Sequence, residues 1–149
     1  MTDARIEVVR RTTLSAGQAW ERLTAWERHG EFLPLTKVHV DADRRGEAGA
    51  CFVARTSLGR LGFDDPMEVT SWRPPGAATP GLVRIVKRGR VVVGWAVLTV
   101  TPVGPGALVE WTEHARFRAA GPFLDGPTRV VGRRVFGRLV DGLLADRPD

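Results

Sequence analysis

The sequence predicts an α+β fold in which a curved antiparallel sheet of about seven strands wraps around a long C-terminal helix. Between residues 36 and 117 the chain reads as strand after strand, separated only by short turns rich in glycine and proline. Short turns favour antiparallel neighbours, because a parallel neighbour needs a long crossover connection. After Pro127 the apolar residues recur every four positions, which is the spacing of an amphipathic helix.

The N-terminal part of the chain shows the pattern of one strand, followed by a helix N-cap. Residues 4–12 alternate as a strand, and Ser15 is then a good N-cap with Gln18 as its capping-box partner. The helix that follows has a heavily aromatic face that includes Trp20, and a second short helical turn is expected around 31–33. The remaining strands are expected at 36–42, 48–57, 62–72, 81–88, 91–101 and 107–117.

The C-terminal helix is expected over 128–145, with Thr128 or Asp125 as its N-cap. A sheet of this width is broader than one helix, so space should remain between the two for a ligand cavity. The apolar stripe that faces the sheet is expected to consist of Val131, Val135, Leu139 and Leu143.

The bulk properties indicate a single domain over residues 1–149. No apolar run is long enough to span a membrane, and the first residues lack the apolar core of a signal peptide. The lone cysteine, Cys51, cannot form an internal disulfide. These features favour the cytoplasm and no membrane insertion.

The formal net charge is +5, and nearly all of the positive residues are arginines. They are spread along the chain rather than clustered, so a solvated surface is favoured over a nucleic-acid interface. The strand at 91–101 is apolar on both faces, which would suit a homodimer contact.

Catalytic and metal-binding signatures are scarce in the sequence. It has no His-Glu-x-x-His, Gly-x-Ser-x-Gly or Walker A motif and no tyrosine. His114 shares a strand face with Glu110, but zinc needs three or four converging ligands and no others are visible. We therefore expect neither a metal nor a cofactor.

Two segments resemble the START-like superfamily (SRPBCC), which includes bacterial polyketide cyclases and Bet v 1-type proteins. Residues 64–75 contain Trp72 in an apolar-x-Val-x-x-Trp-x-Pro-Pro pattern, and residues 95–111 are similar to the last two strands of the family. The chain departs at Ala107, where the family commonly has threonine. The resemblance implies a helix-grip fold, and it leaves the function open because members include carriers, receptors and cyclases.

Strand alternation predicts which side chains point into the cavity. On the last strand, Glu113 shares the more apolar face with Val109 and Trp111, which makes it a buried carboxylate or one that reaches water at the strand end. Asp65 is a second cavity carboxylate by the same alternation, and both are weak catalytic candidates. The ligand-binding set is predicted to be Trp26, Phe32, Phe52, Met67, Val69, Ile85, Leu98, Val109, Trp111, Glu113, Val131 and Val135.

We therefore expect a protein that binds a small hydrophobic or aromatic molecule, lipid-like or polyketide-like, between the sheet and the C-terminal helix. The alternative is a cyclase or aromatase type of enzyme, a lyase or dehydratase in which Glu113 or Asp65 acts as general base. The sequence shows no convincing acid–base pair, so binding without turnover is favoured.

Overall fold

The computed structural model describes residues 4–41, 46–118 and 125–145. Its strands and helices follow the order that the sequence predicts. They are β1 (Ala4–Thr12), α1 (Ala16–Leu23), α2 (Trp26–His29), β2 (Thr36–Val40), β3 (Cys51–Leu58), β4 (Leu61–Arg73), β5 (Gly81–Arg88), β6 (Val92–Val103), β7 (Gly106–Phe117) and α3 (Asp125–Leu144).

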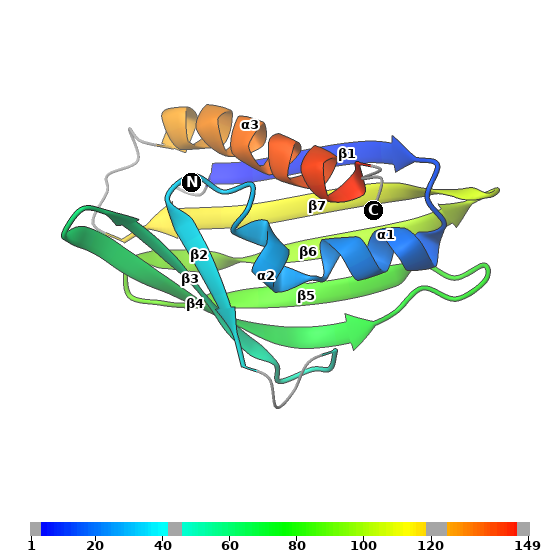
Figure 1. The fold of residues 1–149 in the computed structure, drawn as a ribbon, viewed down its shortest axis with the longest axis horizontal. Coiled ribbons are helices and arrows are strands. Elements are labelled where there is room, and N and C mark those ends of the chain that lie inside the picture. The colour runs from blue at the N-terminus through cyan, green and yellow to red at the C-terminus, as the bar shows by residue number, and fades with distance from the viewer. Residues whose placement is uncertain (1–3, 42–45, 119–124, 146–149) are drawn as a thin grey trace.

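The strands form one seven-stranded sheet in the order β1-β7-β6-β5-β4-β3-β2. Every neighbouring pair is antiparallel, which confirms the predicted topology. The sheet curls, and the three helices lie on its concave side, with α3 along β1 and β7 and with α1 and α2 in front of β5 and β6 (Figure 1). The curved sheet therefore covers the helices on one side only.

The start of α1 is fixed by its cap. The Ser15 hydroxyl accepts a hydrogen bond from the Gln18 backbone N–H, and the Gln18 side chain accepts one from the Ser15 N–H. A cap of this kind contributes about 1 kcal/mol. The helix ends at Thr24, so the second helical segment lies at Trp26–His29 and the predicted turn at 31–33 is not helical.

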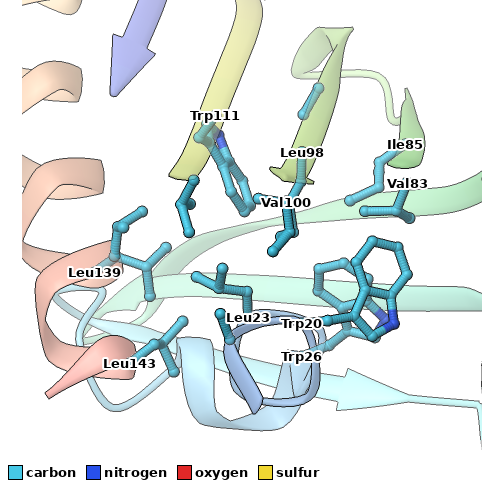
Figure 2. Packing of buried hydrophobic residues seen from close by; sticks show 14 of the residues in the cluster. Trp20, Leu23, Trp26, Val83, Ile85, Leu98, Val100, Trp111, Leu139 and Leu143 are labelled. Carbon is cyan, nitrogen blue, oxygen red and sulfur yellow. The ribbon is translucent and has the colours of Figure 1, made fainter. Parts of the chain in front are cut away.

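A close-packed core joins α1, α3 and the middle of the sheet. Leu23 of α1 faces Leu139 and Leu143 of α3, and all three side chains are fully buried (Figure 2). Burying one such leucine contributes roughly 1.5–3 kcal/mol. Val100 and Val83 continue the same core along β6 and β5.

The predicted stripe of α3 is only half right. Leu139 and Leu143 are buried as expected, but Val131 is 60% exposed. One helical turn takes about 3.6 residues, so residues four positions apart differ by about 40° around the helix axis. A stripe with a four-residue repeat therefore leaves the buried face within a few turns. Val140 and Phe136 pack against the core instead. The helix also begins at Asp125, so Thr128 lies inside it and is not its N-cap.

Two glycines of α3 let the helix lie close to its neighbours. A Cβ on Gly132 would overlap with the side chain of Ile6 on β1, and one on Gly142 would overlap with the ring of Phe32. Gly137 is also buried. These glycines lower helix propensity, but they permit the tight contact that holds α3 on the sheet.

Candidate functional site

A cavity of about 210 Å³ lies on the concave face of the sheet, between α2, α3 and strands β2 to β7. Small inner residues on three strands leave this space: Ala54 on β3, Ala96 on β6 and Ala115 on β7. Aromatic rings form much of the wall. Trp26 stacks on Phe52 with ring centroids 4.9 Å apart.

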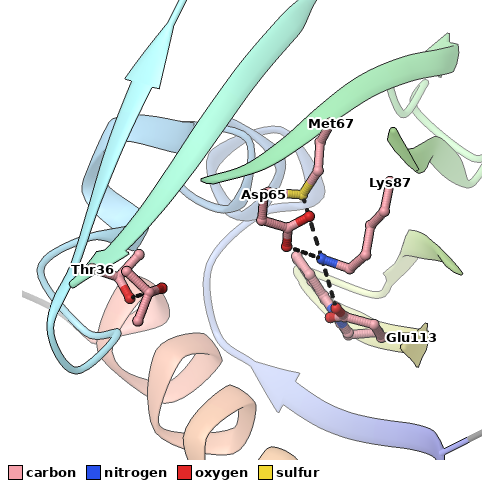
Figure 3. A network of polar contacts seen from close by, with 7 residues as sticks. Thr36, Asp65, Met67, Lys87 and Glu113 are labelled. Atoms are coloured by element: carbon pink, nitrogen blue, oxygen red, sulfur yellow. Dashed lines mark hydrogen bonds and ion pairs between the residues drawn. The ribbon is translucent and has the colours of Figure 1, made fainter. Parts of the chain in front are cut away.

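A buried ionic cluster forms part of the cavity wall, and Figure 3 shows its side chains. The Lys87 Nζ donates to Asp65 Oδ2 at 2.6 Å and lies 3.3 Å from Glu113 Oε1. The side chains of Lys87 and Glu113 are only 7% and 4% exposed. Lys87 is opposite Met67 on β4 and Gly94 on β6, and the missing side chain at 94 lets it reach across β6 towards β7.

The two carboxylates differ in how fully they are hydrogen-bonded. Glu113 accepts from Lys87 at Oε1 and from the Trp111 indole N–H at Oε2, at 3.2 Å. Asp65 accepts from Lys87 at Oδ2, while its Oδ1 is buried with no hydrogen-bond partner among the described residues. A buried polar atom left without a hydrogen-bond partner costs about 1–3 kcal/mol. A bound molecule that donates a hydrogen bond to Oδ1 would remove this cost.

The charges of this cluster are set by burial and by the neighbouring groups. Burial alone lowers the pKa of Lys87, but the charges of Glu113 and Asp65 and the hydrogen bonds to both outweigh it and raise the pKa above 10.5. Lys87 is therefore a cation at neutral pH.

His29 of α2 also lines the cavity and is neutral. Burial lowers its pKa from 6.5 to about 4, and the hydrogen bond between its Nε2 and the Leu23 carbonyl at 2.8 Å opposes this only in part. The Nε2 therefore carries the hydrogen, since a carbonyl can only accept. The imidazole serves as a structural link between α2 and α1.

Comparison with solved structures shows which fold this is. Human STARD10 superposes with a TM-score of 0.72 at 11% identity over 94% of this chain and 63% of its own. A STAR-related lipid transfer protein from Xanthomonas axonopodis gives 0.68 at 16% identity, over 92% of this chain and 84% of that one. The aromatase/cyclase Zhui from a Streptomyces species gives 0.64 at 15% identity, over 95% and 92%.

This chain has the START-like helix-grip fold. Neither a protein-family model nor a curated protein sequence matches it.

Half of the predicted ligand-binding set lies on the wall of the helix-grip cavity. Alternation placed the strand residues among them on the concave face, and Asp65 is there as well. The residues of the predicted set that line the cavity are Trp26, Phe52, Met67, Ile85, Trp111 and Glu113.

The other half of the set lies elsewhere. Val69, Leu98 and Val109 point to the concave face but are buried in the part of the core that the helices fill. Neither Val131, which is exposed, nor the half-buried Val135 is part of the cavity wall. Phe32 packs on the core beside Gly142, outside the cavity wall.

Lys87, His29 and Phe136 are cavity residues that sequence reasoning missed. A signal for Lys87 was present, since it continues the inward alternation of Val83 and Ile85 on β5. Its place at the end of the strand, next to Arg88, is more typical of a solvent-exposed side chain. His29 and Phe136 could not be assigned to the cavity from the sequence, because their place depends on where α2 and α3 lie on the sheet.

The outward face of the helix-grip sheet contains the other polar candidates. The ring of His114 stacks on Trp95 at 4.3 Å, and Arg84 lies 5.3 Å above the same indole. The described residues contain no group of three or more His, Cys, Asp or Glu side chains that could hold a metal ion. None of the described helices is long and apolar enough to cross a membrane.

Proposed function

We propose that this chain binds a small, mainly apolar molecule in the cavity beneath α2 and α3. The observation that carries the proposal is the cavity itself, with apolar and aromatic walls that include one ionic cluster. Protein interiors are otherwise close-packed. A ligand that fills the space of about 210 Å³ would gain from covering its apolar walls.

The size of the cavity favours a ligand of one or two rings. Sites for drug-sized molecules measure roughly 300–1,000 Å³, and this cavity is smaller. The names of similar structures, a lipid transfer protein and an aromatase/cyclase, support a hydrophobic ligand in general. The residues proposed to contact it are Trp26, Phe52, Met67, Ile85, Trp111 and Glu113.

A binding titration with a cavity-filling variant tests this proposal. We expect naphthalene, followed by protein NMR, to bind with a Kd in the micromolar range and to shift resonances of the cavity wall. Ala96→Leu extends an inner side chain into the cavity and should weaken binding at least about tenfold, which equals about 1.4 kcal/mol. Val97→Leu, which enlarges the neighbouring side chain by one carbon on the outer face of β6, is the control.

If a broad panel of one- and two-ring compounds causes no shifts on the cavity wall, the proposal is wrong. Mass spectrometry of gently purified protein adds a second measurement. An apolar molecule that co-purifies with the wild type and not with Ala96→Leu would support the same site.

A second candidate function is ring closure of a poly-β-carbonyl chain, and the free oxygen of Asp65 favours it. Such a reaction begins when a base takes the proton from a carbon between two carbonyls. That carbon then bonds to another carbonyl carbon, whose oxygen takes up a proton. Both oxygens of Glu113 face donors of the chain, whereas Oδ1 of Asp65 faces none among the described residues, so Asp65 is the proposed base.

Turnover of a linear poly-β-ketone separates this candidate from simple binding. Under the enzyme reading, the wild type cyclises the chain faster than buffer does, and Asp65→Asn abolishes the acceleration while the compound still binds. If the wild type gives the uncatalysed rate, the chain is a carrier for such compounds and not an enzyme.

A further inference from the structure

We propose that the ligand of this cavity carries a protonated amine that pairs with Asp65 beside Lys87. This inference rests on the proposed function and adds the chemical class of the ligand. It follows from the hydrogen-bond inventory of the ionic cluster and from the charge that the cluster leaves over.

The first step concerns Glu113. Its partners, the Lys87 ammonium and the Trp111 indole N–H, are groups that can only donate. Each oxygen of Glu113 therefore faces a donor of the chain itself. Glu113 has no oxygen without a partner, in contrast to Asp65.

The second step concerns Lys87, whose ammonium has three N–H donors and no acceptor. These are directed to Asp65 Oδ2, Glu113 Oε1 and the Met67 sulfur, the last at 3.7 Å. No donor of Lys87 is left for a ligand carboxylate, phosphate or carbonyl. An anionic ligand would also meet the two carboxylates at close range, which is unfavourable in a buried site.

The third step concerns the charge that is left. Among the described residues that line the cavity, the charged ones are Lys87, Asp65 and Glu113, since His29 is neutral. One ammonium faces two carboxylates, so the described wall holds one acidic side chain more than it holds basic ones. The Oδ1 of Asp65 is buried and faces no donor among the described residues, and the residue is part of the cavity wall.

An ammonium on the ligand supplies both the missing donor and the missing positive charge. Hydrogen bonds to a charged partner contribute about 1.5–3 kcal/mol, roughly twice the value of neutral ones. The wall also offers the aromatic rings of Trp26, Phe52 and Trp111, whose faces attract cations. An apolar body of one ring with a short aminoalkyl arm fits the small volume of the cavity.

The test compares three ligands that share one body. These are 3-phenylpropylamine, 3-phenylpropan-1-ol and 3-phenylpropanoate, titrated against the full chain by calorimetry at pH 7. We expect the amine to bind at least about tenfold more tightly than the alcohol, and the carboxylate to bind most weakly.

Two variants assign the preference to Asp65. Asp65→Asn keeps the shape but removes the charge, and it should bring the ratio of amine to alcohol affinity close to one. Asp64→Asn changes the neighbouring exposed carboxylate, which pairs with Arg55, and should leave the ratio as in the wild type. If Asp65→Asn does not fold, the wild-type ratios decide by themselves.

Equal binding of the three ligands, or tightest binding of the carboxylate, overturns the inference and leaves the apolar cavity proposal standing. An amine preference that persists in Asp65→Asn also overturns it. If none of the three ligands binds while naphthalene does, the amine class is wrong. If naphthalene fails as well, the proposed function itself is wrong.

Discussion

Lys87→Met removes the ammonium between Asp65 and Glu113 while keeping an unbranched side chain. All three side chains are at most 12% exposed. Removing one partner of a buried ion pair costs about 3–5 kcal/mol, because the other charge stays buried without compensation. Two carboxylates share this ammonium, so we expect a loss near the upper end, about 4–5 kcal/mol. That is a large part of a typical total stability of about 5–15 kcal/mol.

Urea titration followed by tryptophan emission at pH 7 measures this loss as a change in the free energy of unfolding. Lys37→Met is the matched control, because Lys37 is the other lysine of the chain and is exposed on β2. It should change the stability by less than about 0.5 kcal/mol. A loss in Lys87→Met no larger than that of Lys37→Met would refute the buried ionic cluster.

The pH dependence gives an independent check of the same cluster. The pKa of Lys87 is higher in the folded chain than its ordinary value of 10.5. A group of this kind stabilises the fold fully below its unfolded pKa, and the contribution is lost as the pH rises through the folded value. The wild type should therefore lose stability above pH 10.5, and Lys87→Met should lack this part of the decline.

Three further predictions test other parts of the structure. Because burial lowers the pKa of His29 from 6.5 to about 4, the wild type should lose up to about 3 kcal/mol of stability as the pH falls from 6.5 towards 4. His29→Phe should abolish that loss in urea titrations across this range, whereas a change at exposed His39 should not. Val140→Asp should cost several kcal/mol in urea, and Val131→Asp should cost under about 1 kcal/mol, since only Val140 is buried; equal losses would contradict the helix phase. Gly142→Ala should lower the melting temperature despite its better helix propensity, because the new methyl overlaps with a packed ring; a rise would contradict the close contact.

Much of the fold was predictable because it depends on local signals. The short turns between strands fixed the antiparallel order, and the two-residue turn between β3 and β4 places Gly59 at a φ of 61°, where glycine is favoured. The pair of Ser15 and Gln18 marked the start of α1 correctly. Each of these features involves residues within a few positions of one another, so one segment of sequence contains the whole signal.

The site was predictable in part, for a related reason. A strand has a strict two-residue period, so alternation put Glu113, Trp111, Met67 and Asp65 on the concave face correctly. A helix has no such integral period, and a four-residue repeat drifts around it. The prediction therefore failed at Val131, although it held at the other end of α3.

The sequence by itself determined which side chains face inward from the sheet. Only the tertiary structure decided where along that face the helices fill the space and where they leave a cavity. Val109 and Trp111 share one face of β7, yet one is packed in the core and the other lines the cavity. The difference depends on the volume that side chains from distant segments occupy above each residue, and no local pattern records that volume. For the same reason, only the folded chain brings Lys87 between its two carboxylates.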